Sequence, residues 1–254
     1  MRGTNQTHYV GSLAQAPELK YTPGGLAILE ITVAGRCDVL AADGTPKQAP
    51  FYNRCKCFGK YAESLAESLG RGDVVNVHGR LEYRAFEIEG EKRSAVETVV
   101  ATLGTLAGRF VTQDDARGQP VLQGGLNRVT LGGNLTKDAD LKRLPTGLCV
   151  ARLSVAVNER YGEDGEKVGF FDVQAWGELA EALAEGAKGQ GIVGVGRLLN
   201  DAWTDPGGTK RYGTRVELER AHLALGAPAK PEAAVGAATP PAREPAPPAA
   251  DLPF

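Results

Sequence analysis

The feature that most constrains the fold is an internal duplication of the chain. At an offset of 122 residues, a segment that begins at Gly11 aligns without a gap with one that begins at Gly133. The matching residues are Gly11 with Gly133, Leu13 with Leu135, Leu19-Lys20 with Leu141-Lys142, Pro23 with Pro145, and Gly25-Leu26 with Gly147-Leu148. A register held over more than twenty positions indicates duplication rather than chance. Since 254 residues are enough for about two domains, the sequence predicts two domains of one fold.

A second repeated segment predicts a strand that runs directly into a short helix. It reads FYNRCKCFGKYAESL at 51–65 and GFFDVQAWGELAEAL at 169–183. In the first copy, strict alternation divides the side chains between two faces. One face carries Tyr52, Arg54, Lys56 and Phe58, and the other carries Phe51, Asn53, Cys55 and Cys57. Aromatic rings at both ends with cations between them suit a chain of bases and phosphates, although an amphipathic strand with incidental exposed rings gives the same pattern.

Each repeat is predicted to contain five strands with one helix between the third and the fourth. Alternating runs follow turn residues in both copies, at 27–34 and 149–157. We expect loops at 36–50 and 158–169, each with an Asp-Gly pair at a hairpin tip. Because the helix occurs once rather than after every strand, the order favours an all-β fold. The expected unit is a small closed barrel of the OB type with one short helix per domain.

Composition excludes several classes of protein. The net charge is −2, so the chain is unlike the strongly basic proteins that wrap duplex DNA. The four cysteines lack disulfide or metal-ligand spacing, and none of the three histidines stands at ligand spacing. The sequence has no apolar run of about 18 residues and no charged leader followed by one. We therefore expect a protein of the reducing cytoplasm with no metal and no cofactor.

Composition also sets the expected domain boundaries. We expect a first domain at 1–106, a polar and Gly-rich linker at 107–125, and a second domain at 126–225. Eight of the 15 prolines fall within 226–254, where Ala supplies most of the remainder. Such a segment cannot bury enough apolar surface to offset its ordering entropy, so we predict a disordered tail.

Several stretches recur in order in both copies and point to one family. They are VGSLAQAPELKYTPGG and LGGNLTKDADLKRLPTG, YNRCKCFGKYAE and FFDVQAWGELAE, RGDVVNVHGRLEYRAF and KGQGIVGVGRLLNDAW, together with the terminal DLPF. Each repeat resembles the DNA-binding domain of bacterial single-stranded DNA-binding proteins, over roughly 5–103 and 126–222. Members of that family usually have one barrel per chain and four per assembly. The resemblance therefore implies the subfamily with two OB domains per chain, and a homodimer.

The resemblance also implies a function and a set of functional residues. It implies sequence-tolerant binding of single-stranded DNA in DNA replication, recombination and the repair of DNA damage. The residues that would stack on bases are Tyr52, Phe58, Phe86, Phe170, Trp176 and Trp203. The expected phosphate contacts are Lys20, Arg54, Lys56, Arg84, Lys142, Arg143, Arg197 and Lys210. Replication and repair proteins would dock on the terminal Asp251, Leu252, Pro253 and Phe254.

Two departures from the family pattern affect these expectations. The family's terminal tip usually follows a run of acids, whereas here Asp251 stands nearly alone. In the second domain, the positions equivalent to three first-domain cations carry Asp172, Gln174 and Asp201. We therefore expect the two domains to bind DNA differently, the first with the steeper dependence on salt.

Two other classes of function stay open at the level of sequence. Some OB barrels carry nuclease or ligase chemistry, and Asp138, Asp140, Asp164 and Glu166 form the best acid cluster for a metal. Because Asp164 falls in an expected loop and the first copy has no matching cluster, we expect no enzyme. An RNA-binding or purely protein-interacting pair of OB domains is the other class, since contacts to the 2′-OH leave no signal in the sequence.

Overall fold

The structure is a computed structural model that describes residues 3–40, 44–88, 91–161, 165–204, 208 and 210–224. The first half contains β1 (Thr4–Leu13), β2 (Glu18–Tyr21), β3 (Ala27–Leu40), β4 (Pro46–Phe58), α1 (Gly59–Ser68), β5 (Val74–Ile88) and β6 (Glu91–Thr105). The connecting segment contains β7 (Thr112–Asp114) and β8 (Pro120–Gln123). The second half contains β9 (Leu126–Leu135), β10 (Asp140–Arg143), β11 (Cys149–Tyr161), β12 (Gly165–Trp176), α2 (Gly177–Ala182), β13 (Gly191–Thr204) and β14 (Lys210–Leu223).

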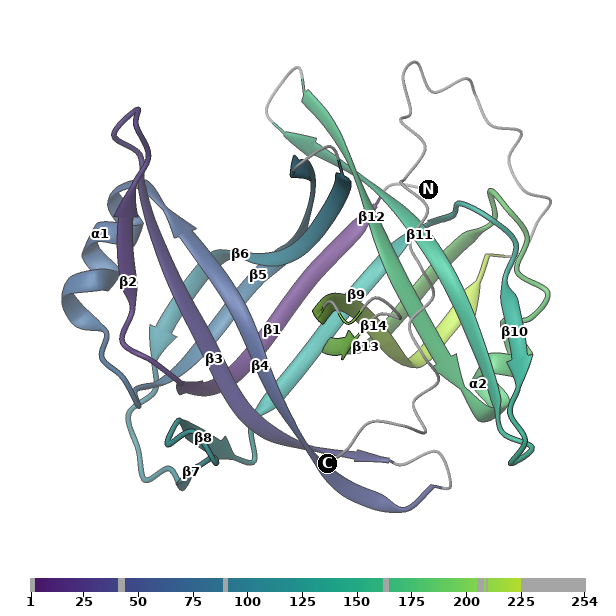
Figure 1. Cartoon of the computed structure of the whole chain (residues 1–254), viewed down its shortest axis with the longest axis horizontal. Helices are drawn as coiled ribbons and strands as arrows, with labels where there is room; N and C mark the ends of the chain where they lie inside the picture. Colours follow the sequence, from purple (N-terminus) through teal and green to yellow (C-terminus); the bar gives the residue numbers. More distant parts are fainter. Residues whose placement is uncertain are drawn as a thin grey trace.

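Five strands of the first half close into a barrel. β1 pairs with β5, β5 with β6, and β3 with β4, all antiparallel, while β4 and β6 pair in parallel. The ring is completed where Ser12 of β1 lies opposite Ala34 of β3. α1 follows β4 and buries Ala62 and Leu65, as the helical spacing of the sequence predicts. The predicted closed barrel with a helix after its third long strand is confirmed (Figure 1).

The second half repeats this ring strand by strand. β9 pairs with β13, β13 with β14, and β11 with β12 and β9, while β12 and β14 pair in parallel. α2 again follows the third long strand and buries Ala180. The duplication read from the sequence is therefore a duplication of the complete barrel (Figure 1).

The two barrels are joined by a shared seam between their first strands. β1 and β9 pair antiparallel from Thr4 opposite Gly132 to Val10 opposite Leu126. At the centre of this ladder Thr7 lies opposite Val129, which is its own equivalent at the offset of 122 residues. Both barrels thus contribute the same strand in the same register, and a pseudo-two-fold axis relates them. Through this seam the strands form one continuous sheet (Figure 1).

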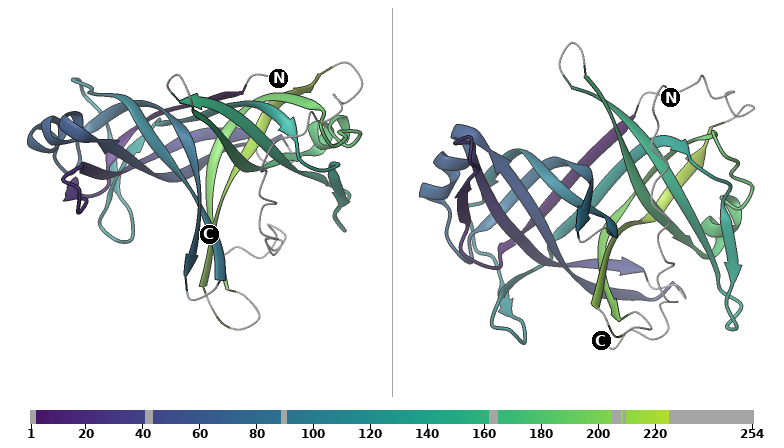
Figure 2. Two further views of the ribbon diagram at one scale, coloured as in Figure 1. Left: turned by 90° about the horizontal axis from the view of Figure 1, so that it is seen from above. Right: turned by 45° about the horizontal axis from the view of Figure 1, so that its top comes forward.

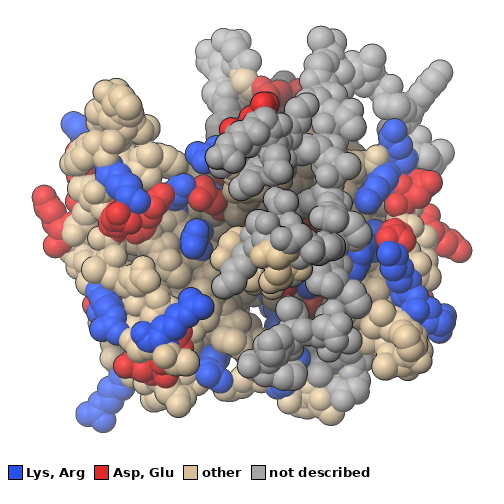
Figure 3. Space-filling model, viewed as in Figure 1, with Lys and Arg blue, Asp and Glu red and all other residues tan. Residues whose placement is uncertain are grey.

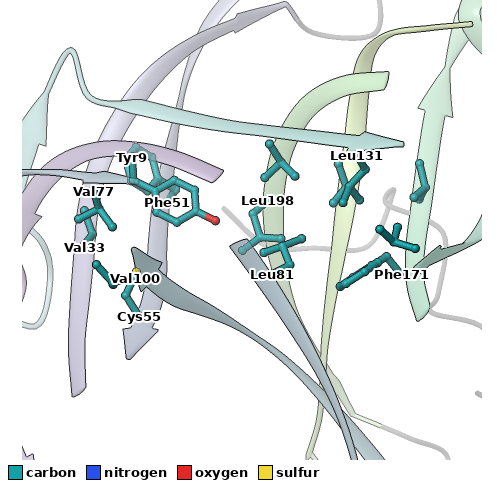
Figure 4. Packing of buried hydrophobic residues seen from close by; sticks show 14 of the residues in the cluster. Tyr9, Val33, Phe51, Cys55, Val77, Leu81, Val100, Leu131, Phe171 and Leu198 are labelled. Atoms are coloured by element: carbon teal, nitrogen blue, oxygen red, sulfur yellow. The ribbon is translucent and has the colours of Figure 1, made fainter. Parts of the chain in front are cut away.

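One hydrophobic core runs through both barrels. Tyr9 of β1 is fully buried, and its hydroxyl lies 3.1 Å from Oγ1 of Thr98. Phe51 packs beside Tyr9, while Leu81 of β5 lies next to its equivalent Leu198 of β13 (Figure 4). Apolar burial that is continuous across the seam stabilises the two barrels as one unit.

The segments 36–50 and 158–169, expected as loops, are instead long ribbons. β3 continues to Leu40 and β4 begins at Pro46, while β11 continues to Tyr161 and β12 begins at Gly165. The loop expectation was wrong because neither segment has clear apolar alternation of its own. The strands are held instead by pairing with each other across the hairpin.

Each ribbon reaches across to the other barrel. From β12, Lys167 forms an ion pair with Glu82 of β5 at 2.5 Å, and Phe170 meets Tyr83 edge to face with ring centroids 5.7 Å apart. From β3, Cys37 lies beside the guanidinium of Arg197 in the second barrel. The β5–β6 and β13–β14 ribbons project together from one side of the molecule (Figure 2).

No helix within the described ranges has the length and hydropathy to span a membrane.

The connecting segment is more ordered than its composition suggests. β7 and β8 form a short hairpin, and β8 pairs in parallel with β3. Ser12 donates its hydroxyl to the carbonyl of Pro120 at 2.7 Å, and Arg71 donates to the carbonyl of Gly118. The hairpin is therefore fastened to the outside of the first barrel.

Candidate nucleic-acid interface

The strand β4 shows the alternation that the sequence predicts. The side chains that point into the barrel and are buried are Phe51, Asn53, Cys55 and Cys57. Those that point outward are Tyr52, Arg54, Lys56 and Phe58. Because the inward residues belong to the core, the outward residues have a fixed spacing and a fixed direction on the barrel surface. A rigid strand is the kind of element that can position binding groups accurately.

Tyr52 is held by the connecting hairpin. Its hydroxyl donates to Oδ2 of Asp115 at 2.7 Å, and its side chain packs against a small cluster formed by Ala14, Ala34 and Val121. Oδ1 of Asp115 in turn accepts two backbone N–H groups of the hairpin turn. Burial and the facing carboxylate raise the pKa of Tyr52 to about 12. The predicted stacking of Tyr52 on a base stays a prediction, and it requires the part of the ring that the hairpin leaves open.

Phe58 and Trp176 stand at equivalent points, where a strand passes into a helix. The next residue is Gly59 or Gly177, with φ of 66° and 59°, a conformation that side-chain-bearing residues rarely adopt. Phe58 is 38% exposed, and the indole Nε1 of Trp176 donates to Oε2 of Glu217 at 3.0 Å. Each ring is thus held at a rigid turn on the outside of its barrel, as a stacking platform requires.

The other predicted stacking residues lie on or near the projecting ribbons. On β5, the guanidinium of Arg84 lies 5.7 Å from the ring centroid of Phe86, within the range of a cation–π contact. Phe170 is partly buried because it packs against Tyr83 of the other barrel. Trp203 belongs to β13, and its side chain lies outside the described residues.

Most of the predicted phosphate contacts are already paired with carboxylates. Nζ of Lys56 lies 3.2 Å from Glu30 and 2.8 Å from Glu97, and this side chain is only 18% exposed. Surface pairs also join Lys20 to Glu18 and Glu30, Lys142 to Asp140, and Arg143 to Glu181. Cations and acids accordingly lie side by side over the surface (Figure 3). Arg54 and Arg84 are exposed and form no ion pair with any residue that the structure describes.

The structure places Arg197 inside rather than on the surface. It is 8% exposed, and its Nε and Nη2 donate to Oε1 of Glu217 at 3.0 and 2.5 Å. Burial raises the pKa of the neighbouring Cys37 thiol, although the guanidinium beside it opposes that rise. A phosphate could reach Arg197 only if Glu217 moved away. In the present arrangement Arg197 fastens the β3–β4 ribbon of the first barrel to the second.

The acids of the second barrel are less exposed to an incoming strand than expected. Asp201 pairs with Arg215, whose Nε lies 3.1 Å from its Oδ2, and both side chains are mostly buried. Gln174 alternates with the core residues Val173 and Ala175 and so lies on the outward side of β12, but it is covered there and only 4% exposed. Asp172 is partly buried. The contrast between the two barrels is therefore smaller in charge than the sequence comparison suggests.

Sequence reasoning missed the most exposed large apolar side chain of the described residues. Tyr212 of β14 is 73% exposed, compared with 58% for Tyr21. A signal was present in the alternation of Tyr212, Thr214 and Val216, of which Val216 is buried. That alternation shows that Tyr212 continues an inward-facing row beyond the end of the barrel.

Some predicted sites lie outside the described residues. Lys210 belongs to β14, but its side chain is outside them, and so is all of 225–254 with the terminal Asp251, Leu252, Pro253 and Phe254. Of the acid cluster considered for an enzyme, Asp164 is also outside, and Asp138 accepts the backbone N–H of Lys188 at 2.8 Å. Within the described ranges, no group of three or more His, Cys, Asp or Glu residues could hold a metal ion.

The two barrels correspond to a known family. The model of the "Single-strand binding protein family" matches residues 4–106 and again residues 126–224. The chain belongs to this family. It is therefore a binding protein rather than an enzyme. The two matched ranges coincide with the two closed barrels and leave out the β7–β8 hairpin.

Relatives of this family match almost the whole chain. The single-stranded DNA-binding protein of Thermus aquaticus is 43% identical, and the alignment covers 100% of this chain and 99% of the relative. The single-stranded DNA-binding protein of Deinococcus radiodurans is 43% identical, with 89% and 77% covered. The crystal structure of the wild-type single-stranded DNA binding protein from Thermus aquaticus matches with a TM-score of 0.72 at 40% identity, covering 91% of this chain and 97% of that one.

Proposed function

We propose that this chain binds single-stranded DNA with little preference for sequence, and that it coats and protects such DNA during replication, recombination and repair. The observation that carries the proposal is the equivalent placement of Phe58 and Trp176 at rigid turns on two closed barrels. Stacking on an aromatic ring is worth about 1–3 kcal/mol per base and accepts any base. Membership of the family supports the proposal, as do relatives that are named for binding single-stranded DNA.

Electrostatic attraction to phosphates is expected to come from few side chains. Arg54 and Arg84 of the first barrel are exposed and form no ion pair within the described part of the chain. The paired lysines can contribute only after releasing their carboxylates, which reduces their net gain. Stacking should therefore supply a larger share of the affinity than it does in strongly basic DNA-binding proteins.

The test is a comparison of strand types with the full chain. A labelled dT oligomer should bind much more tightly than a hairpin stem of the same length, because paired bases in a helix offer no free faces. Fluorescence quenching on binding would report on the second barrel alone, since both tryptophans, Trp176 and Trp203, belong to it. Equal affinity for the stem and the oligomer would refute the proposal. Competition between poly(dT) and poly(U) decides between DNA and RNA.

We also propose an assembly and a role for the tail. Two chains would form a homodimer that presents four barrels, and this dimer would work in the cytoplasm at the nucleoid. In each chain the first barrel would span 1–106, the connection 107–125, the second barrel 126–225 and a disordered tail 226–254. Replication and repair proteins would dock on the terminal DLPF. Sedimentation of the full chain as a monomer at micromolar concentration would refute the dimer. A pull-down in which deletion of Phe254 changes no partner would refute the docking role.

A further inference from the structure

An aromatic ring stands exposed at the outer part of the β13–β14 ribbon. Tyr212 is 73% exposed and lies opposite the small Ala202. A tyrosine ring is large, and it gains most when its faces are covered by another apolar surface. Within the part of the chain that the structure describes, the ring of Tyr212 therefore contributes little to packing.

The face of the ribbon that carries Tyr212 is fixed against the first barrel. Two residues along β14, the hydroxyl of Thr214 donates to Oδ1 of Asn200 at 3.0 Å. Nδ2 of Asn200 donates to the carbonyl of Tyr52 at 2.9 Å and lies 3.2 Å from Oδ1 of Asn53. The base of the ribbon is thus attached to β4, the strand that carries the predicted DNA-contacting residues of the first barrel. Beyond this attachment the ribbon projects from the molecule (Figure 2).

An unpaired cation lies on β4 close to this attachment. Arg54 is two residues from Tyr52 on the same outward face, and it is exposed without an ion pair among the described residues. The contact through Asn200 places the β13–β14 ribbon beside β4, so Arg54 and Tyr212 lie on neighbouring elements. Alternation of a cation with an aromatic ring is the chemistry that single-stranded nucleic acid recognises.

The pseudo-two-fold axis gives the first barrel no matching ring. In this part of the two barrels, equivalent residues of β5 and β13 are 117 positions apart, so Ala85 corresponds to Ala202. Ala202 lies opposite Tyr212, whereas Ala85 lies opposite Ser94 of β6. At this position only the β13–β14 ribbon carries an aromatic ring, whereas the β5–β6 ribbon has Ser94. The two ribbons also differ in how they contact the other barrel. The β13–β14 ribbon contacts β4 through Asn200, whereas the β5–β6 ribbon contacts β12 through Tyr83.

From these observations we propose that Tyr212 of the second barrel stacks on a base of DNA bound to the first barrel, so that the first barrel's binding surface is completed by a residue of the second. The inference rests on the proposed function. It assigns a stacking role to a residue that the sequence patterns did not single out. It also gives a route by which one strand passes from barrel to barrel, from β4 at Arg54 to the β13–β14 ribbon.

The test compares variants of the full chain by anisotropy of a labelled dT oligomer over a salt series. Tyr212→Ala should weaken binding about 5- to 150-fold, the range that corresponds to the loss of one stacked base. The slope of log K against log salt should not change, because no phosphate contact is removed. Tyr212→Phe, which keeps the ring, should bind as the wild type does. Tyr21→Ala removes another exposed tyrosine, 58% exposed on β2, and should have no effect.

Each outcome separates this inference from the function on which it rests. A wild type that does not bind dT defeats the proposed function itself. A wild type that binds, with Tyr212→Ala binding equally well, overturns only the role of Tyr212. Equal losses in Tyr212→Ala and Tyr21→Ala would show a general effect of exposed rings and would also overturn it. If Tyr212→Ala keeps its affinity but changes the sedimenting mass, the ring contacts a second copy of the chain instead.

Discussion

Two cations on one face of β4 should contribute very differently to DNA binding. Lys56 lies between Glu30 and Glu97 at 3.2 and 2.8 Å, whereas Arg54, two residues away, is exposed. Arg54→Gln and Lys56→Gln change the net charge of the protein by the same amount. Any difference between the variants therefore reports on the local setting of each cation rather than on total charge.

The expected size of the difference follows from counterion release. Each phosphate neutralised on a single strand contributes about −0.7 to the slope of log K against log salt. Arg54→Gln should make the slope shallower by about 0.7, which over a fourfold increase in salt corresponds to a change of about 2.6-fold in affinity. Lys56→Gln should leave the slope nearly unchanged. It should instead lower the free energy of unfolding by about 1 kcal/mol, because two partly buried ion pairs are lost.

The assay is a titration of a dT oligomer with the full chain at four or more salt concentrations, together with urea unfolding of each variant. Equal reductions in slope for the two variants would refute the reasoning. That result would mean that Lys56 leaves both carboxylates on binding, and that ion pairs within the free protein do not predict which cations bind phosphate.

Other predictions follow from contacts at the seam, the hairpin and the histidines. Asn127→Ala should lower the free energy of unfolding by about 3 kcal/mol, because this buried amide loses three hydrogen bonds. The equivalent Asn5→Ala should have a smaller effect, since Asn5 is only partly buried. Urea titration measures both, and a larger loss for Asn5→Ala would contradict the burial argument. Tyr52→Phe should speed hydrogen exchange in β7 and β8 about 10-fold, because the bond to Asp115 is lost, and an unchanged rate would show that this bond does not hold the hairpin. The ring of His78 is exposed but stacks on that of His8, and partial loss of hydration together with the charge of His8 lowers the pKa of His78 below its unfolded value. Protonation therefore favours unfolding, and stability should fall as the pH drops from 7 to 5. His78→Asn should flatten that fall, and a wild type that becomes more stable over this range would show the sign to be wrong.

Local patterns in the sequence were sufficient to predict the five long strands of each barrel, the helices and the duplication. The inward and outward sets of β4 were predicted correctly because a period of two is decided within a few residues of chain. The position of α1 was equally accessible, since Gly59 and the buried Ala62 and Leu65 mark its start and its face. The β3–β4 and β11–β12 ribbons were not predicted, because they form by pairing across the hairpin and by contacts with the other barrel, such as that of Cys37 with Arg197.

The state of the predicted site residues could not be read from the sequence. Lys56 and Glu97 are far apart in the chain, and they meet because β4 and β6 pair in parallel with Lys56 opposite Val99. Likewise, the hydrogen bond of Tyr52 could not be predicted, because nothing in the polar connecting segment indicated that Asp115 would reach it. Composition identifies residue types that suit DNA binding. Only the fold decides which of these side chains already form ion pairs or hydrogen bonds within the protein.

The seam between β1 and β9 has a consequence for how the protein is synthesised. Thr4–Leu13 leaves the ribosome early, but its partner at Leu126–Leu135 follows about 120 residues later. At a synthesis rate of about 5–20 residues per second, the outer edge of β1 waits roughly 6–24 s for β9. During this interval the edge of β1 presents unpaired backbone N–H and C=O groups. The first strand of another nascent chain on the same messenger RNA can pair with them. Covalent fusion of the two barrels limits the time in which that mispairing can occur.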